Sequence, residues 1–207
     1  AMKNIFQIHG VKRLIALALT FAVVQLLISA NIINDYLQAT MVTMCVNIIL
    51  AVSLNLITGF TGQFSLGHAG FMSIGAYTCA LITLRLSSTF GFIIGVFSGA
   101  LAAALIGFLV GLPTLRLRGD YLAIATLGMS EIIRIIFLNL KITNGAAGLN
   151  GIPQFVNWVW LFIFTVGTIW IISNFIKSSH GRACISIRED EIAAEAIGIQ
   201  PRKYKIM

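Results

Sequence analysis

The sequence has few charged residues, few prolines and few cysteines. Only 10% of its 207 residues are charged, whereas 58% are hydrophobic, and the mean hydropathy is +0.94. A soluble domain carries roughly a quarter charged residues, so this chain has too few to cover a globular surface. The same composition excludes disordered, fibrous and disulfide-scaffold proteins. The sequence therefore predicts an integral membrane protein.

Cysteine and histidine are too sparse to form a recognisable site. Cys45 and Cys79 lie in apolar segments, Cys184 lies in a basic loop, and the three histidines are far apart in the sequence. No CxxC pair is present, so we expect no metal site, no disulfide framework and no cofactor. A GxxxxGK[ST] nucleotide-binding motif is also absent. Any ATP hydrolysis must therefore come from a partner, and the chain itself is not predicted to be an enzyme.

Acidic residues are fewer than basic ones, and the difference gives a net charge of +7. The charges are clustered between long neutral stretches, which is typical of membrane topology and not of nucleic-acid binding. We expect the lipid bilayer, and no nucleic acid, as a partner.

Long runs without charge predict the membrane spans. Residues 36–84, 86–115 and 142–176 contain no Asp, Glu, Lys or Arg. A helix that crosses the hydrocarbon needs about 20 apolar residues. Dividing the apolar sequence at Gly, Pro and polar breaks predicts an all-α, polytopic helix bundle with about six spans: 14–32, 37–58, 69–86, 90–112, 121–140 and 155–176. The first apolar run also fits a signal peptide; we favour a retained helix, because more spans follow it.

The basic residues predict the orientation of these spans. With the N-terminus inside, eleven Lys and Arg fall in the inner segments, and only Arg85 and Lys141 fall in the outer ones. This distribution obeys the positive-inside rule. We therefore expect a cytoplasmic N-terminal segment (1–13), a transmembrane domain (14–176) and a cytoplasmic C-terminal segment (177–207).

Residues 59–70 form a glycine-rich junction between the second and third predicted spans. Glycine at this density weakens a helix, and irregular backbone at membrane depth must be buried in protein or line a wet cavity. Broken helices of this kind build solute sites in transporters, although a tight cytoplasmic turn explains the glycines equally well. His68 is either a functional group or a packing donor. Candidate pathway residues are Asn47, Asn55, Gly62, Gln63, Ser65, Gly67 and His68.

A small residue recurs at every fourth position along the fourth predicted span. Such a stripe lets another helix approach to backbone contact distance, so we interpret it as a structural packing seam, without specifying the neighbouring helix. Its members are Gly91, Gly95, Gly99, Ala103, Gly107 and Gly111.

Two charges lie inside the fifth predicted span. Glu131 and Arg134 are three residues apart, share a helix face and can form an ion pair. Charge at membrane depth indicates either function or a pair that fixes helix packing. The glycine-rich outer loop that follows, 143–153, either presents backbone to a solute or merely connects two spans.

The segment 177–205 is polar and rich in charge. Within it, Ile185, Ile192, Ala196 and Ile199 lie roughly on one face of a predicted short amphipathic helix, with acidic residues near its start. Such a helix lies on a membrane surface or docks into a groove of a soluble protein. The acidic residues favour the protein partner over anionic lipid.

Four motifs in one order resemble a known family. GFTGQFSLGHAGFMSIGAY (59–77), LPTLRLRGDYLAIATLGMSEIIR (112–134), TNGAAGLNGI (143–152) and GRACISIREDEIAAEAIGI (181–199) are similar to the branched-chain amino-acid ABC transporter permeases, and in particular to the larger of their two permease subunits. The resemblance covers about residues 36–205. Urea-type permeases share much of the pattern.

The resemblance implies an inner-membrane permease that forms the pathway for branched-chain or similar amino acids. Its implied partners are a second permease subunit, two cytoplasmic ATPase subunits and an extracytoplasmic solute-binding protein. The segment 181–199 would seat in an ATPase cleft, and it resembles the EAAxxxG signature except that Ile192 occupies the Glu position, one residue after Glu191. The implied coupling residues are Arg188, Glu191, Ala193, Ala194, Glu195 and Gly198.

Family members continue for several spans beyond this segment, so the resemblance also leads us to expect a C-terminally truncated permease. Three alternatives stay open from the sequence. They are an ion-coupled carrier or channel, a non-transporting permease fragment, and a permease for urea or an amide.

Overall fold

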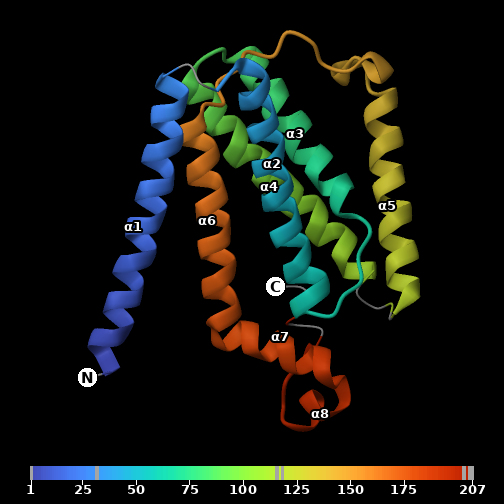
Figure 1. Cartoon of the computed structure of the whole chain (residues 1–207). Helices are drawn as coiled ribbons and strands as arrows, with labels where there is room; N and C mark the ends of the chain where they lie inside the picture. The colour runs from blue at the N-terminus through green and yellow to red at the C-terminus, as the bar shows by residue number, and fades with distance from the viewer. Residues whose placement is uncertain (1, 31–32, 115–116, 118, 202–203, 205–207) are drawn as a thin grey trace. The chain divides into compact units, whose positions relative to one another are not determined.

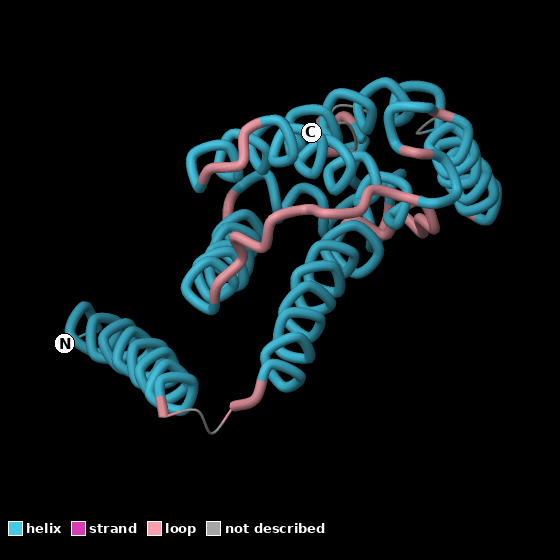
Figure 2. Tube along the Cα trace, turned by 90° about the horizontal axis from the view of Figure 1, so that it is seen from above, coloured by secondary structure: helices cyan, strands magenta, loops and turns pink. Residues whose placement is uncertain are grey.

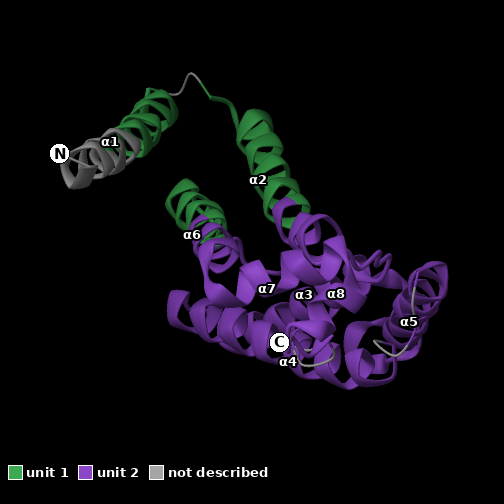
Figure 3. Ribbon diagram, turned by 90° about the horizontal axis from the view of Figure 1, so that it is seen from below, with its two compact units in different colours: residues 1–51, 156–169 green, residues 52–155, 170–207 purple. Residues whose placement is uncertain are grey.

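The computed structural model describes residues 2–30, 33–114, 117, 119–201 and 204, with side chains from residue 15 onward. Within these residues the regular structure is entirely helical (Figure 2), which confirms the predicted all-α class. The chain divides into two compact units, residues 1–51 with 156–169 and residues 52–155 with 170–207 (Figure 3).

The first unit contains α1 (Met2–Ser29), most of α2 (Asp35–Asn55) and the beginning of α6 (Trp158–Lys177). α1 begins at Met2, well before the predicted start of the first span at residue 14, so the basic N-terminal segment is helical. The Phe21 and Phe162 rings pack with their centroids 5.1 Å apart and join α1 to α6.

The second unit contains the end of α2, the end of α6 and all other elements. These are the π-helix η1 (Leu56–Phe60), α3 (His68–Arg85), α4 (Thr89–Thr114), α5 (Asp120–Asn139), the 3₁₀ helices η2 (Lys141–Thr143) and η3 (Gly145–Ala147), α7 (Ser179–Glu189) and α8 (Glu191–Ala196).

α3 and α4 lie side by side and form the main packing contact of this unit (Figure 1). A Cβ atom added to Gly99 would lie 2.7 Å from the Gly75 carbonyl oxygen, and one added to Gly95 would lie 3.1 Å from the Cys79 carbonyl oxygen. Side chains at these positions would therefore force the two backbones apart.

α5 also packs against the N-terminal part of α3 through small residues. A Cβ on Gly70 would lie 3.0 Å from the Ser130 Cα, and the rings of Tyr77 and Phe137 stack with centroids 4.5 Å apart. Leu122, Thr126 and Ile133 belong to the buried face of α5. α3 is therefore held to both α4 and α5 by close backbone contacts.

Four of the described helical segments are long and apolar enough to cross a membrane: Asp35–Phe60, Thr89–Thr114, Asp120–Asn139 and Trp158–Lys177. Among the described residues, the structure thus supports four of the about six predicted spans. α3 forms as a helix over the predicted span 69–86, but His68, Arg85 and its hydroxyl residues make it less apolar than the other four. The described apolar part of α1, Ile15–Ser29, is too short for the same criterion.

The polar C-terminal segment forms two helices, and the predicted single amphipathic helix is wrong. α7 begins after a sharp corner at which the Ser178 hydroxyl accepts a hydrogen bond from the Gly181 N–H at 3.2 Å. It ends before Asp190, whose extended backbone separates α7 from α8. Ile185 therefore lies on α7, whereas Ile192 and Ala196 lie on α8.

Candidate functional site

The glycine-rich junction is a break between two helices, as the sequence predicts. α2 ends at Asn55 and continues as one π-helical turn over Leu56–Phe60. The chain then runs without regular structure from residue 62 to residue 67, and α3 begins at His68. Gly62 has φ +68°, a left-handed conformation that favours glycine. In the structure, the segment between α2 and α3 covers residues 56–67, and from here on the junction means these residues.

The two helices that flank the junction are joined by a side-chain hydrogen bond. Ser53 Oγ, near the end of α2, lies 3.1 Å from His68 Nε2, at the start of α3. His68 is half-buried in this position. The bond fits the role of a packing group for His68, because it ties the two ends of the irregular segment together.

α5 supplies a second attachment for the junction. The backbone N–H of Leu66 donates to the Thr126 hydroxyl at 3.0 Å, and that hydroxyl donates to the Ala123 carbonyl at 3.0 Å. Gly67 lies against the same residue, because a Cβ there would be 2.9 Å from the Thr126 carbonyl oxygen. The sequence does not single out Thr126, since one threonine in an apolar span gives no signal of its own.

A large cavity lies beside the junction within the second unit. It has a volume of about 680 Å³, and we call it the main cavity. Its wall is mostly apolar and comes from the junction, α3, α4, α5, α6 and α7. Its polar side chains include Thr61, Gln63, Ser65, Thr114 and Thr126. Pockets for small ligands typically have volumes of about 300–1,000 Å³ and a few polar groups in an apolar wall.

The structure brings only some of the predicted pathway residues to this cavity. Gln63 and Ser65 line it. Asn55 is exposed at the end of α2, and Asn47 lies within the part of α2 that belongs to the other unit. Gly62, Gly67 and His68 shape or anchor the junction through the contacts given above.

The packing seam divides into two parts. Gly91, Gly95 and Gly99 are buried, and a Cβ at any of them would press on backbone, at Leu86, Cys79 and Gly75 respectively. Ala103 is half-buried. A Cβ on Gly107 would make only ordinary contact, 3.7 Å, with the Phe71 ring. Gly107 and Gly111 line the main cavity.

α8 is a short helix with well-defined ends. The Asp190 carboxylate accepts hydrogen bonds from the N–H groups of Ile192, at 2.9 Å, and Ala193, at 3.1 Å. At the other end Gly198 has φ +87°, its N–H donates to the Glu195 carbonyl, and the Ile199 N–H donates to the Ala194 carbonyl, both at 3.0 Å. These bonds resemble a Schellman motif, which explains the glycine.

Two isoleucines, one on α8 and one directly after it, are exposed. Ile192 is 80% exposed and Ile197 is 74% exposed, whereas Ala194 is buried. Ala193, Glu195 and Gly198 are not buried. Ile197 is not among the predicted coupling residues, because it falls at an unspecified position of the EAAxxxG signature.

The remaining predicted coupling residues, Arg188 and Glu191, line a smaller pocket of about 260 Å³ between the junction and the α7–α8 boundary. Arg188 Nη1 donates to the Gly59 carbonyl oxygen at 2.6 Å. Its guanidinium also pairs with Glu189. α7 thus reaches the π-helical turn of the junction directly.

Glu131 and Arg134 form the ion pair that their spacing predicts, with Arg134 Nη1 3.0 Å from Glu131 Oε2. Both side chains are more than half exposed. Neither residue is in the lining of the main cavity.

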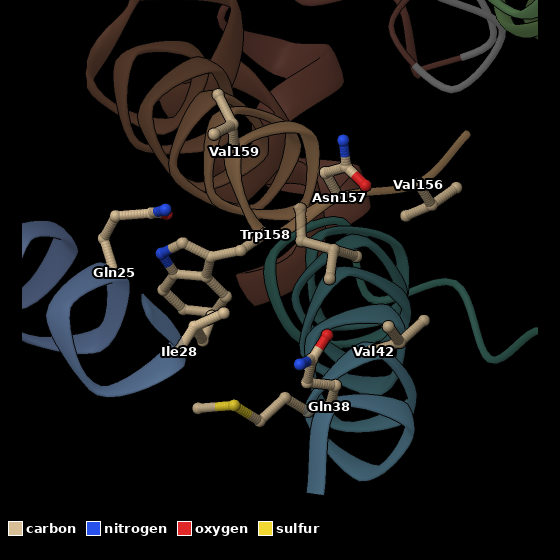
Figure 4. A pocket seen from close by; sticks show the side chains of 10 residues that line it. Gln25, Ile28, Gln38, Val42, Val156, Asn157, Trp158 and Val159 are labelled. Carbon is tan, nitrogen blue, oxygen red and sulfur yellow. The ribbon is translucent and has the colours of Figure 1, made fainter. Parts of the chain in front are cut away.

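The first unit has a pocket that the sequence does not predict. It has a volume of about 260 Å³ and lies among α1, α2 and α6 (Figure 4). The amide side chains of Gln25, Gln38 and Asn157 line it, together with Trp158. Within the described part of the chain, the buried Trp158 Nε1 has no hydrogen-bond acceptor.

Comparison with known proteins shows clear relatives. Residues 36–207 match the family described as the permease component of the branched-chain amino acid transport system. The chain is 37% identical over 194 aligned residues to the high-affinity branched-chain amino acid transport system permease protein LivM of Escherichia coli (strain K12). It is 36% identical over an alignment of the same length to LivM of Salmonella typhimurium (strain LT2).

Each of these two alignments covers 77% of this chain and 45% of the relative, so the chain spans less than half the length of the curated relatives it matches. No solved structure gives a significant match.

Proposed function

Because the chain belongs to the family of branched-chain amino acid transport permeases, we propose that it is the permease subunit of an ATP-driven importer. Its solute is a branched-chain or similar amino acid. The chain forms part of the pathway through the membrane, and a partner hydrolyses the ATP. As a multi-pass protein of the bacterial inner membrane, it has both termini in the cytoplasm, which is the orientation that the positive-inside rule favours.

The main cavity carries this proposal. Its volume of about 680 Å³ and its mostly apolar wall suit a small solute with an aliphatic side chain. Gln63, Ser65 and Thr126 supply neutral hydrogen-bonding groups beside a broken helix, which is where transporters bind polar groups of their solutes. The exposed ion pair of α5 lies outside that lining, so an ion-coupled carrier has less support.

The proposed partners are a second permease subunit, two cytoplasmic ATPase subunits and an extracytoplasmic solute-binding protein. We assign ATPase contact to α8, because Ile192 on this helix and Ile197 directly after it are exposed apolar side chains near Ala193 and Glu195. Exposed apolar side chains on a short helix fit a groove in a soluble partner.

Co-purification in mild detergent with the cognate ATPase tests this assignment. We expect Ile192→Asp to reduce ATPase recovery at least about tenfold, since a carboxylate in an apolar contact loses its hydration without a partner. Ile152→Asp is the matched control, because Ile152 is also exposed but lies in the loop between η3 and α6 instead of on α8. Equal recovery with both variants would remove α8 from the ATPase contact.

Uptake by the reconstituted complex tests the solute. We expect ATP-dependent uptake of labelled leucine, isoleucine or valine into vesicles that also contain the partner subunits. Uptake of urea instead would change the solute class. Gradient-driven uptake by this chain alone would contradict the importer proposal.

A further inference from the structure

Arg188 is a predicted coupling residue that contacts the junction directly. Its Nη1 lies 2.6 Å from the Gly59 carbonyl oxygen, although the two residues are 129 positions apart in the sequence. A charged donor to a carbonyl forms a stronger hydrogen bond than a neutral pair. This contact joins α7 to the π-helical turn that follows α2.

The aliphatic part of the Arg188 side chain also depends on a glycine. A Cβ added to Gly62 would lie 2.7 Å from Arg188 Cγ and 3.2 Å from Arg188 Cβ. Gly62 also has φ +68°, which other residues adopt only with strain. Because Gly62 has no Cβ and adopts a positive φ without strain, the Arg188 side chain can lie along the junction backbone.

Neighbouring side chains hold the guanidinium in place. Arg188 Nε lies 3.1 Å from Glu189 Oε1, so the adjacent carboxylate orients the group toward Gly59. Ile187 is buried and anchors the same turn of α7. The backbone of Arg188 is thus held in α7, and its guanidinium is held at the junction by the Gly59 carbonyl.

The residues that Arg188 holds are next to residues that line the main cavity. Gly59 and Gly62 lie on either side of Thr61 in the chain, and Gln63 follows; Thr61 and Gln63 both line that cavity. A displacement of α7 relative to the junction must therefore change the hydrogen bond to Gly59 or move the cavity wall.

From these contacts we propose that Arg188 is a positioning residue that transmits movement of α7 and α8 to the junction, and not a residue whose guanidinium binds the ATPase. The effect of this inference on transport rests on the proposed function. The contact itself is testable without transport.

Hydrogen–deuterium exchange of the purified full chain in lipid nanodiscs tests the contact. We expect Arg188→Met to raise exchange in peptides that cover residues 59–67. Arg182→Met is the matched control, because Arg182 lies on the same helix and donates to the Lys177 carbonyl at 2.9 Å instead of to the junction. Arg188→Lys keeps a charged donor and should restore at least part of the protection. Raised exchange with both methionine variants, or with neither, would overturn the proposal.

Transport by the reconstituted complex tests the consequence. We expect Arg188→Met to retain ATPase association and ATP hydrolysis within about twofold, but to lose at least about tenfold in uptake, the scale of one charge-assisted hydrogen bond. Loss of hydrolysis and association together with uptake would place Arg188 at the ATPase contact instead. If the wild-type complex shows no ATP-driven uptake, the proposed function fails, while the exchange experiment still decides the Arg188 contact.

Discussion

At the scale of single residues, glycines with the same sequence spacing have different roles. Gly99 lies against the backbone of Gly75, whereas a Cβ added to Gly107 would meet the edge of the Phe71 ring, at 3.7 Å, as its nearest described neighbour outside its own helix backbone. The regular spacing predicts that both glycines lie on one face of α4. It does not predict how closely α3 approaches α4 at each position, and that approach separates the packing glycines from the glycines at the cavity.

Replacement of these two glycines by alanine tests the difference. We expect Gly99→Ala to lower the free energy of unfolding by about 1–3 kcal/mol, because the Gly75 carbonyl must move. Gly107→Ala should be neutral within about 1 kcal/mol, since its new methyl group makes ordinary contact and alanine favours the helix. Thermal unfolding in detergent measures both variants. Equal destabilisation would show that the whole seam is a packing contact.

The thiol of Cys184 provides a second test at this scale. Cys184 is buried on α7, and burial raises the pKa of its thiol. Less thiolate is then present at neutral pH, so alkylation is slow. Ser179 lies on the same helix and is more accessible.

We therefore expect maleimide to label Cys184 more slowly at pH 7.5 than a cysteine introduced by Ser179→Cys. Cys45 and Cys79 are replaced by alanine in both proteins, and Cys184 is also replaced in the second one. The labelling rate of Cys184 should keep rising at alkaline pH after the rate of the exposed thiol has levelled off. The same rate and pH profile for both thiols would contradict the burial of Cys184.

At the scale of elements, α8 shows how capping groups define a helix of only six residues. The acidic cluster in the sequence predicts a helix N-terminus, and the structure places Asp190 at that position. The cluster does not predict that the same aspartate ends α7. The apolar spacing from Ile185 to Ile199 suggests one continuous helix. A periodic apolar pattern cannot show that one residue within it, here Asp190, has an extended backbone.

Removal of the Asp190 cap should destabilise α8. We expect Asp190→Ala to cost about 1 kcal/mol and to raise hydrogen exchange in peptides covering 191–199 about fivefold. Asp190→Asn keeps an oxygen acceptor without the charge, and it should preserve most of the protection. If the asparagine variant exchanges as fast as the alanine variant, the carboxylate charge matters more than the cap.

The junction illustrates the same limit of prediction. Its glycine density correctly predicts a break in the helix near residues 59–70. The density does not predict the π-helical turn before the break, nor the partners Ser53 and Thr126, which come from helices without a distinctive motif. Tertiary contacts therefore decide which of the polar side chains near the junction face the cavity.

At the scale of the whole molecule, composition and motif order are sufficient for the class and the family. The long charge-free runs predict an all-helical membrane protein, and four motifs point to the permease family that the comparison shows. Freedom from charge alone does not show that a helix is apolar enough to cross a membrane. α3 has no Asp, Glu, Lys or Arg before Arg85, yet its glycines, hydroxyls and terminal residues make it less apolar than the spanning helices.

Among the hydrogen bonds around the junction, three join residues at least 15 positions apart, and their separations in the sequence differ widely. The Ser53–His68 bond spans 15 positions, the Leu66–Thr126 bond 60, and the Arg188–Gly59 bond 129. Because a chain is synthesised from its N-terminus, the first bond can form before α5 has left the ribosome, and the Arg188 bond becomes possible last. The bond that joins α2 to α3 can therefore form early in biosynthesis, and the bond that joins the junction to α7 becomes possible only later.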